Sequence, residues 1–378
     1  MNRWIVGLVA LWGLVAVSGC GKSQGSNEIV VGEYGSMTGS EATFGQGTHK
    51  GIMLAVDEVN SSGGVLGKQV RDVNYDDQGD QDQAVTVVKR LIDQDGVCAV
   101  LGEVASTNSL AGGGVCQQAK VPMISPSSTN PDVTKGRDYV FRVCFTDDFQ
   151  GAVGAQLALD KGWKKVAVLT CENSDYSKKL AQFFKEKFQS GGGQIVADET
   201  YDKDDKDTKA QLSRIAAANP DAVYLPGYYT NIVLILRQAR QDVSLKVPFF
   251  GGDGWDSAEV LALGPISDGC FYTNHYSPDD QRPSVQQFIK AYEAKYNGEI
   301  PDAFGITGYD AAKVLFDAIK RANSTDPTAI RDALAQTKDF PGAGGNITID
   351  ENHNARKPIV VLEIQGGKTH LAETINPQ

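Results

Sequence analysis

The amino-acid sequence predicts an α/β protein built from two similar lobes, each a mainly parallel sheet flanked by helices. Two observations support this fold class. From Glu28 onward, short apolar runs alternate with amphipathic stretches of helical spacing, which is typical of βαβ units. In addition, one strand-and-helix pattern recurs later in the chain. The length of 378 residues also favours two domains over one.

The alternation is clearest in the first hundred residues. We expect strands at 29–32, 70–75 and 98–102, and helices at 49–60 and 81–94. Within the first of these helices, Ile52, Val56 and Val59 keep the spacing of one buried face, and Gly63 and Gly64 mark its end. Strands and helices that alternate in this order predict a parallel sheet covered by helices.

The internal repeat consists of two ordered matches. Residues 99–102 (AVLG) recur as 222–225 (AVYL), an offset of 123 residues, and both are followed by a Thr-Asn pair. Residues 120–125 (KVPMIS) recur as 246–251 (KVPFFG), an offset of 126 residues. Two matches in the same order, at nearly one offset, favour a duplicated lobe.

The carboxyl ends of these strands predict a ligand site, because open parallel sheets bind ligands there. In lobe one these ends are rich in hydroxyl groups, from Ser106, Thr107, Ser125, Ser127, Ser128 and Thr129. In lobe two they carry aromatic rings and one carboxylate, from Tyr228, Tyr229, Trp255 and Asp253. Hydroxyls and helix N-termini accept an anion and a carboxylate accepts a cation, so the two lobes together suit a small zwitterion. The alternative is that the hydroxyls only cap helices and the aromatic rings only pack.

The N-terminus predicts export. Residues 1–19 combine a basic start with an apolar run too short to span a membrane, as in a signal peptide. The small residues before Cys20 are similar to a bacterial lipobox, which implies cleavage and a lipid on Cys20; the alternative is an ordinary signal with an incidental cysteine. Residues 20–27 then form a polar tether. We expect a protein that is anchored by lipid to a membrane, in the periplasm or at the cell surface.

Charge and composition exclude several function classes. A net charge of −11 argues against a nucleic-acid partner, which requires a dense basic surface. The four histidines, at positions 49, 275, 353 and 370, show no metal-binding spacing, and no nucleophile–base set stands out. We therefore expect no metal, no cofactor and no enzymatic activity.

The same segments resemble the substrate-binding proteins of branched-chain amino-acid ABC importers, the leucine/isoleucine/valine-binding family with a type I periplasmic fold. The similarity runs from about Glu28 to about Glu363. Its most specific segments are 35–39 (GSMTG), 57–67 (DEVNSSGGVLG), 75–77 (YDD), 121–129 (VPMISPSST), 236–239 (LRQA) and 303–304 (AF).

The resemblance implies a layout and a set of ligand contacts. Lobe one would comprise 28–147 plus 278–352 and lobe two 148–277 plus 353–378, joined by a hinge of three crossings. The family's carboxylate site falls on Ser106, the backbone around Ser127, and Thr129, and its ammonium site on Asp253 and Tyr228. Tyr176 and Phe44 would close over the ligand, with Trp255 and Phe304 as pocket neighbours. The expected partners are an amino acid, branched-chain or aliphatic, and an ABC permease, and we expect a monomer.

The sequence departs from the leucine-type pattern in several places. Asp253 replaces a glutamate, Phe44 a tyrosine and Ser127 an alanine, and the cysteine pair of that receptor is absent at Gly79 and Ala105. Other ligands therefore stay open as alternatives to an aliphatic amino acid: a polar amino acid, an aromatic acid, an amide or urea. A sensor of the same fold, and less readily an extracytoplasmic enzyme, are the rival functions.

The cysteines allow two disulfides. Cys98 and Cys116 lie on neighbouring predicted elements, and the resemblance places Cys144 and Cys270 near two of the crossings. The alternative is that these cysteines are small buried apolar residues.

Overall fold

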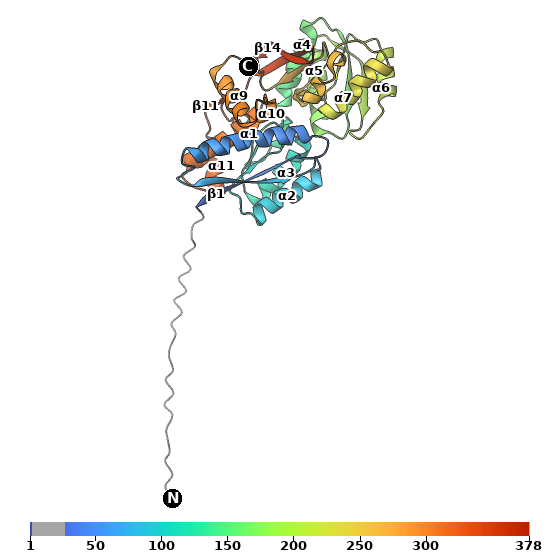
Figure 1. Cartoon of the computed structure of the whole chain (residues 1–378). Coiled ribbons are helices and arrows are strands. Elements are labelled where there is room, and N and C mark those ends of the chain that lie inside the picture. Colours follow the sequence, from blue (N-terminus) through green and yellow to red (C-terminus); the bar gives the residue numbers. More distant parts are fainter. Residues whose placement is uncertain (2–26, 378) are drawn as a thin grey trace.

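A computed structural model of the chain describes Met1 and residues 27–377 (Figure 1). The predicted signal peptide beyond Met1, the predicted tether up to residue 26 and the predicted lipidation site at Cys20 lie outside the described residues. None of the helices within 27–377 combines the length and the apolar character that crossing a membrane requires.

Lobe one is organised around a five-stranded parallel sheet of order β2-β1-β3-β4-β5. Its strands are β1 (Glu28–Gly35), β2 (Gln69–Asp76), β3 (Val100–Leu101), β4 (Met123–Ser125) and β5 (Val140–Arg142). Three helices connect the first four strands: α1 (Ala42–Ser61), α2 (Gln81–Asp93) and α3 (Ser106–Ala119). A short 3-10 helix, η1 (Pro131–Val133), precedes β5.

Lobe two is organised around a seven-stranded sheet of order β14-β13-β10-β9-β8-β6-β7. Five strands are parallel: β6 (Lys165–Cys171), β7 (Gln194–Tyr201), β8 (Ala222–Tyr224), β9 (Phe249–Gly251) and β10 (Phe271–Asn274). Two more, β13 (Ile359–Gln365) and β14 (Lys368–Ile375), extend the sheet in antiparallel fashion. Its helices are α4 (Asp147–Asp160), α5 (Asp175–Ser190), α6 (Lys209–Ala217), α7 (Tyr229–Arg237) with the π-helical η2 (Gln238–Asp242), η3 (Asp253–Trp255), α8 (Ala258–Leu261) and η4 (Gly264–Ile266).

The two sheets share one topology, which confirms the predicted fold class. The parallel strands run β2-β1-β3-β4-β5 in lobe one and β7-β6-β8-β9-β10 in lobe two. The two repeated segments correspond to the third and fourth strand of each order, since they contain β3 and β8, and β4 and β9. The repeat in the sequence therefore marks equivalent strands of the two lobes.

A segment after β10 returns to lobe one. It contains α9 (Pro283–Lys295), α10 (Ala303–Ala322), α11 (Pro327–Ala335), β11 (Phe340–Gly342) and β12 (Gly345–Ile347). The predicted apolar face of α1, with Ile52 and Val56, packs in one buried cluster with residues of α10 and α11 (Figure 1). Gly51 permits this approach, because a Cβ there would lie 1.9 Å from the carbonyl oxygen of Gly305. The domain boundaries at 147, 277 and 352 stay predictions.

Each sheet has an apolar core on both faces. In lobe one, α1, α10 and α11 cover one face, while α2 and α3 cover the other (Figure 1). In lobe two, α4 and α5 cover one face and α6, α7 and α8 the other. The central strands β3, β4, β8 and β9 are buried along their whole length, and most of their residues are apolar.

The disulfide predictions are wrong. All five cysteines of the described residues are free and buried. Cys98 and Cys116 belong to the cores on opposite faces of the lobe-one sheet, so the sheet separates them. The thiol of Cys144 donates to the carbonyl of Ser128, while Cys270 packs in the core of lobe two. These cysteines are small buried residues of the apolar cores, as the alternative interpretation of the sequence predicted.

Candidate ligand-binding site

A small cavity, which we call the inner cavity, lies between the lobes at the carboxyl ends of their parallel strands. Residues of both lobes line it: Phe44, Val104, Ser106, Ser127, Thr129, Tyr176, Tyr228, Asp253, Gly254 and Phe304. Eight of the nine ligand contacts predicted from the sequence are therefore brought together. The free volume of about 10 Å³ is close to what one water molecule needs.

The lobe-one wall carries hydroxyls and a helix N-terminus. Ser106 is the first residue of α3, so the positive end of the helix faces the cavity. Its hydroxyl accepts a hydrogen bond from the backbone N–H of Asn130 at 3.3 Å. Thr129 is 1% exposed, and its Oγ1 has no hydrogen-bond partner, whereas the hydroxyl of Ser127 pairs with that of Thr307 at 2.7 Å. Thr129 thus presents the one unpaired hydroxyl among these three.

Two of the hydroxyls identified in the sequence hold the wall in place. Ser125 donates to the carbonyl of Glu103 at 2.7 Å, and Ser128 donates to the carbonyl of Val104 at 2.8 Å. Ser125 also accepts from the backbone N–H of Ser128 at 2.9 Å. These bonds join the ends of β3 and β4. Ser125 and Ser128 therefore have a structural role, which is the alternative that the sequence analysis left open for the hydroxyls.

The lobe-two wall is centred on Asp253, which is 3% exposed. One carboxylate oxygen accepts from the hydroxyl of Tyr176 and from Nε2 of Gln150, both at 2.9 Å. The other pairs with Nε2 of His275 at 3.0 Å. A carboxylate offers about four acceptor positions, so these three bonds leave one. Sequence reasoning missed Gln150 and His275, because both are distant from Asp253 in the chain and belong to no motif.

Aromatic rings close the remaining sides of the inner cavity. Phe44 of lobe one lies 4.2 Å from Phe304, measured between ring centroids, and makes an edge contact with Tyr228 of lobe two at 5.5 Å. Tyr176 stacks on Tyr228 at 5.0 Å. Burial raises the pKa of both tyrosines well above the usual value, so both are neutral hydroxyl donors.

Trp255 is the exception among the predicted pocket residues. Its side chain is fully buried in an apolar cluster that also contains Phe44, Phe304 and Tyr228, and its Nε1 donates to the carbonyl of Leu225 at 2.9 Å. The ring does not line the inner cavity. Trp255 therefore packs with the residues that line the cavity without lining it itself, and its role as a pocket neighbour stays a prediction.

Hydrogen bonds join the lobes around the cavity. The hydroxyl of Thr230 donates to the carbonyl of Ser40 at 3.1 Å, and the backbone N–H of Asp175 donates to Oγ1 of Thr107, also at 3.1 Å. The backbone N–H of Thr43 donates to the hydroxyl of Tyr229 at 3.3 Å. These contacts describe a closed arrangement of the two lobes.

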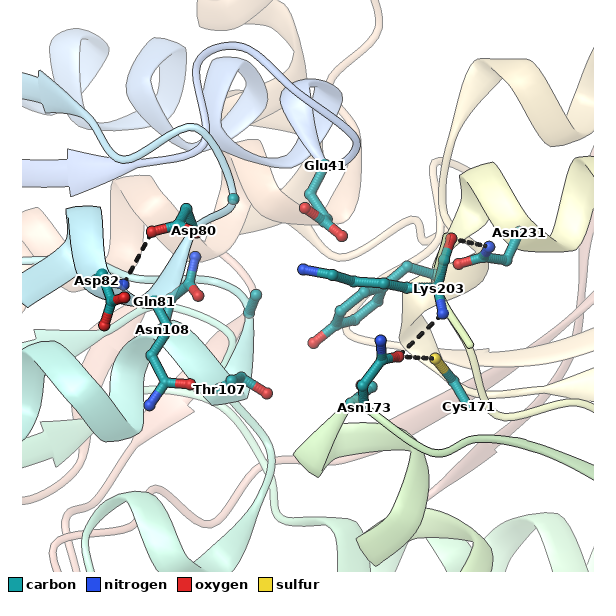
Figure 2. A pocket seen from close by; sticks show the side chains of 14 residues that line it. Glu41, Asp80, Gln81, Asp82, Thr107, Asn108, Cys171, Asn173, Lys203 and Asn231 are labelled. Atoms are coloured by element: carbon teal, nitrogen blue, oxygen red, sulfur yellow. Dashed lines mark hydrogen bonds between the residues drawn. The ribbon is translucent and has the colours of Figure 1, made fainter. Parts of the chain in front are cut away.

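A second cavity of about 310 Å³ forms the mouth of the site (Figure 2). Tyr228 lines both cavities, so the mouth adjoins the inner cavity. Figure 2 shows side chains of the two lobes facing each other, with Lys203 of lobe two extended toward Glu41 of lobe one. Burial raises the pKa of Glu41, and the charge of Lys203 opposes this shift.

Comparison with known proteins agrees with this architecture. A sequence model of the periplasmic binding proteins matches residues 28–369, which is most of the chain. The chain belongs to the periplasmic binding protein family. The family consists of binding proteins, in agreement with the expectation of a receptor rather than an enzyme.

Individual relatives cover nearly the whole of this periplasmic binding protein. The leucine-, isoleucine-, valine-, threonine- and alanine-binding protein of Pseudomonas aeruginosa is 30% identical over 354 residues, covering 93% of this chain and 94% of the relative. The Leu/Ile/Val-binding protein BraC3 of Rhizobium johnstonii is 32% identical over 350 residues, with coverage of 92% and 94%.

Two crystal structures show the same fold. The leucine-binding protein LivK of Thermotoga maritima superposes with a TM-score of 0.88 at 40% identity, covering 92% of this chain and 99% of that one. The branched-chain amino-acid binding protein LivJ of Streptococcus pneumoniae, in complex with isoleucine, superposes with a TM-score of 0.87 at 35% identity, with coverage of 93% and 100%.

Proposed function

We propose that this periplasmic binding protein is an extracytoplasmic solute receptor that binds a small amino acid, branched-chain or aliphatic, and delivers it to an ABC importer permease. The observation that carries the proposal is the pairing of opposite chemistry across the inner cavity. Lobe one offers hydroxyls and the N-terminus of α3, while lobe two offers the carboxylate of Asp253. The names of the two sequence relatives and of the LivJ complex agree with this ligand class.

The α-carboxylate of the ligand would bind to lobe one. Ser106 and Thr129 supply hydroxyls, and the backbone around Ser127 supplies further donors. The buried Oγ1 of Thr129 supports this placement, because an unpaired buried hydroxyl is costly and a ligand carboxylate would satisfy it.

The ammonium group would bind to Asp253 and Tyr228. Three acceptor positions of Asp253 are occupied by Tyr176, Gln150 and His275, so an ammonium takes the remaining one or displaces Gln150. An aliphatic side chain would then contact the rings of Phe44 and Phe304, which pack together at one side of the cavity.

Binding would couple to movement of the lobes. The inner cavity is too small for an amino acid as it stands, so the lobes or the lining side chains must move apart for entry. Three or four charge-assisted hydrogen bonds of roughly 1.5–3 kcal/mol each are enough to stabilise reclosure around the ligand and to leave micromolar affinity, about 8 kcal/mol. The reclosed shape would be the form that the permease recognises.

The remaining expectations belong to the same proposal. The receptor would be a monomer, anchored by a lipid on Cys20 outside the cytoplasmic membrane, with the tether of residues 20–27 leading to lobes bounded at 147, 277 and 352. Intact-mass analysis of the membrane-extracted protein tests the anchor, since a Cys20→Ala variant would lack the added lipid.

Calorimetric titration with isoleucine and leucine tests the ligand class. We expect wild type to bind at least one of them, and Asp253→Ala to lose binding by 100-fold or more. The exposed Asp198, which pairs with Lys185 on the outer surface of lobe two, provides a matched control: Asp198→Ala should keep wild-type affinity. Leucinamide and isocaproate, which each lack one charged group, should bind far more weakly. Unchanged affinity in Asp253→Ala would overturn the proposed site.

A further inference from the structure

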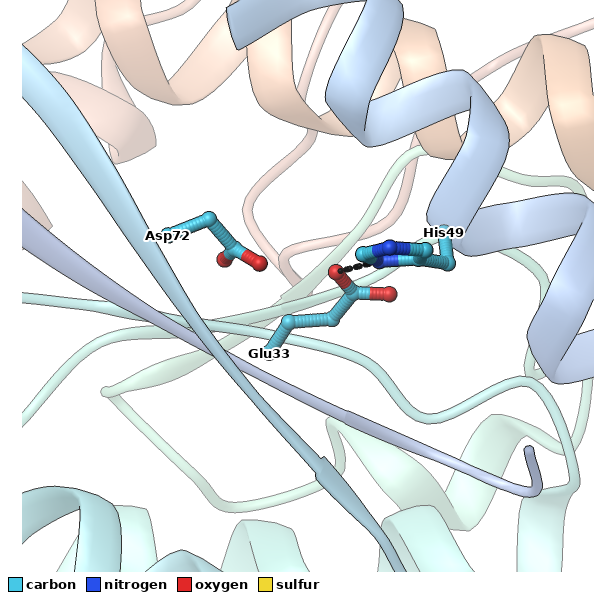
Figure 3. Close-up of side chains that lie close together, drawn as sticks. All are labelled: Glu33, His49 and Asp72. Atoms are coloured by element: carbon cyan, nitrogen blue, oxygen red, sulfur yellow. Dashed lines mark hydrogen bonds and ion pairs between the residues drawn. The ribbon is translucent and has the colours of Figure 1, made fainter. Parts of the chain in front are cut away.

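Three polar side chains of lobe one form a cluster outside both cavities (Figure 3). Glu33 lies on β1, Asp72 on β2 and His49 on α1. In the parallel register Val31 pairs with Asp72 and Glu33 pairs with Asn74, which places the three polar strand residues on one face of the sheet. Helix α1 covers this face, so His49 meets them from above, as Figure 3 shows.

The potential ligand atoms are close enough to share one ion. One atom each of Glu33, His49 and Asp72 lies within 4.8 Å of the other two. Nδ1 of His49 is 2.8 Å from Oε2 of Glu33 and 3.4 Å from the amide of Asn74. A half-turn of that amide exchanges its nitrogen for its oxygen, so Asn74 offers a fourth donor.

The cluster contains buried carboxylate oxygens that have no hydrogen-bond partner. The side chain of Glu33 is 1% exposed, yet its Oε1 has no hydrogen-bond partner, and the buried Oδ1 of Asp72 also has none. Neither carboxylate forms an ion pair with a lysine or arginine among the described residues, since Arg71 pairs with Glu28 instead. Two carboxylates this close repel each other when both are charged, and a bound cation would remove this repulsion.

We propose that Glu33, Asp72 and His49 bind a divalent transition-metal ion of the zinc class. An imidazole with two carboxylates suits zinc and its neighbours, whereas calcium and magnesium prefer all-oxygen sites. The ring of His49 is 37% exposed, which leaves a path from solvent to the cluster. The ion would connect α1 to β1 and β2 and so stabilise lobe one, independently of amino-acid binding.

Zinc titration of the purified full-length protein, stripped with a chelator, tests this site. Wild type should bind one Zn²⁺ per chain with micromolar affinity or better, and the melting temperature should rise when Zn²⁺ is added. His49→Phe and Asp72→Asn should each weaken binding at least 100-fold and abolish the thermal shift. His370, exposed on β14 and outside the cluster, supplies the control: His370→Phe should bind Zn²⁺ as wild type does.

A second readout identifies the ligand set. Co²⁺ substituted into wild type should show visible absorption bands that depend on His49, and these bands should be absent in His49→Phe. Asp72→Asn preserves side-chain shape, so it decides the question if His49→Phe does not fold. Absence of stoichiometric Zn²⁺ binding to wild type, or binding that persists in both variants, would overturn the proposal and leave the cluster as a proton-sharing group.

Discussion

The backbone N–H of Ser106 in lobe one donates a hydrogen bond of 3.4 Å to the hydroxyl of Tyr228 in lobe two. This bond crosses the cleft beside the inner cavity, and it joins the N-terminus of α3 to the residue that lines both cavities. A phenol that closes the lobes and also contacts the proposed ammonium site couples ligand binding to closure.

Tyr228→Phe therefore tests this coupling. Loss of one neutral hydrogen bond costs about 0.5–1.5 kcal/mol, so we expect amino-acid affinity to fall by about 2- to 10-fold. The measurement is isothermal calorimetry with the amino acid that binds best. Tyr75→Phe, which removes a hydroxyl bonded to Asp95 on the outside of lobe one, should leave affinity unchanged. Equal effects of the two variants would contradict the assignment.

Removal of the hydroxyls that would bind the ligand carboxylate should cause a larger loss of affinity than Tyr228→Phe. Ser106→Ala and Thr129→Ala each remove one hydroxyl that would donate to a charged ligand, so each should cost about 1.5–3 kcal/mol of binding free energy. Retained binding in the double variant, measured by calorimetry, would point to an uncharged ligand.

A buried ion pair predicts a large effect on stability. Lys357 and Asp310 are 1% and 0% exposed and lie 3.1 Å apart, and Asp310 also accepts from the backbone N–H groups of Ala343 and Gly344. Lys357→Ala leaves Asp310 charged and buried without its cation, so it should lower the free energy of unfolding by about 3–5 kcal/mol.

The half-exposed pair of Lys313 and Glu58 provides the comparison, at the same distance of 3.1 Å. Lys313→Ala should cost no more than about 1 kcal/mol, because solvent screens an exposed pair. Urea denaturation at neutral pH measures both variants. Similar losses for the two would show that burial does not determine the contribution of Lys357.

Asp302 predicts a pH dependence of stability. Burial raises its pKa from 3.8 to about 7, with further contributions from Asp256 and Glu299, against an opposing effect of Lys50. The folded state then holds the proton of Asp302 more tightly than the unfolded state does, so the contribution of Asp302 to the free energy of unfolding is largest below about pH 4. It is lost as pH rises through 7.

Asp302→Asn removes this titration but can still accept the helix-capping bond from the N–H of Gly305. We expect the stability of wild type, relative to the variant, to decline between pH 4 and pH 7 and to stay constant above pH 7.5. Denaturation curves across this range provide the test, and a difference independent of pH would disprove the titration of Asp302.

The sequence by itself determined the fold class, the two-lobe repeat and most of the inner cavity. Alternating apolar and amphipathic segments require parallel sheets covered by helices, and ligand-binding residues at strand ends follow from that topology. Family resemblance added Phe44, Tyr176 and Phe304, which lie outside the strand ends and have no periodicity that marks them.

Only the tertiary structure decided the features that depend on side-chain direction and on contacts between distant segments. It packed the ring of Trp255 into the apolar cluster beside the cavity rather than into the cavity lining, and it separated Cys98 from Cys116 by a sheet. It also surrounded Asp253 with Gln150 and His275. The same folding brought Glu33, His49 and Asp72 together from two strands and a helix, where the spacing of histidines had indicated no metal site. Linear spacing describes one element at a time, whereas these groups meet only when a helix packs on a sheet.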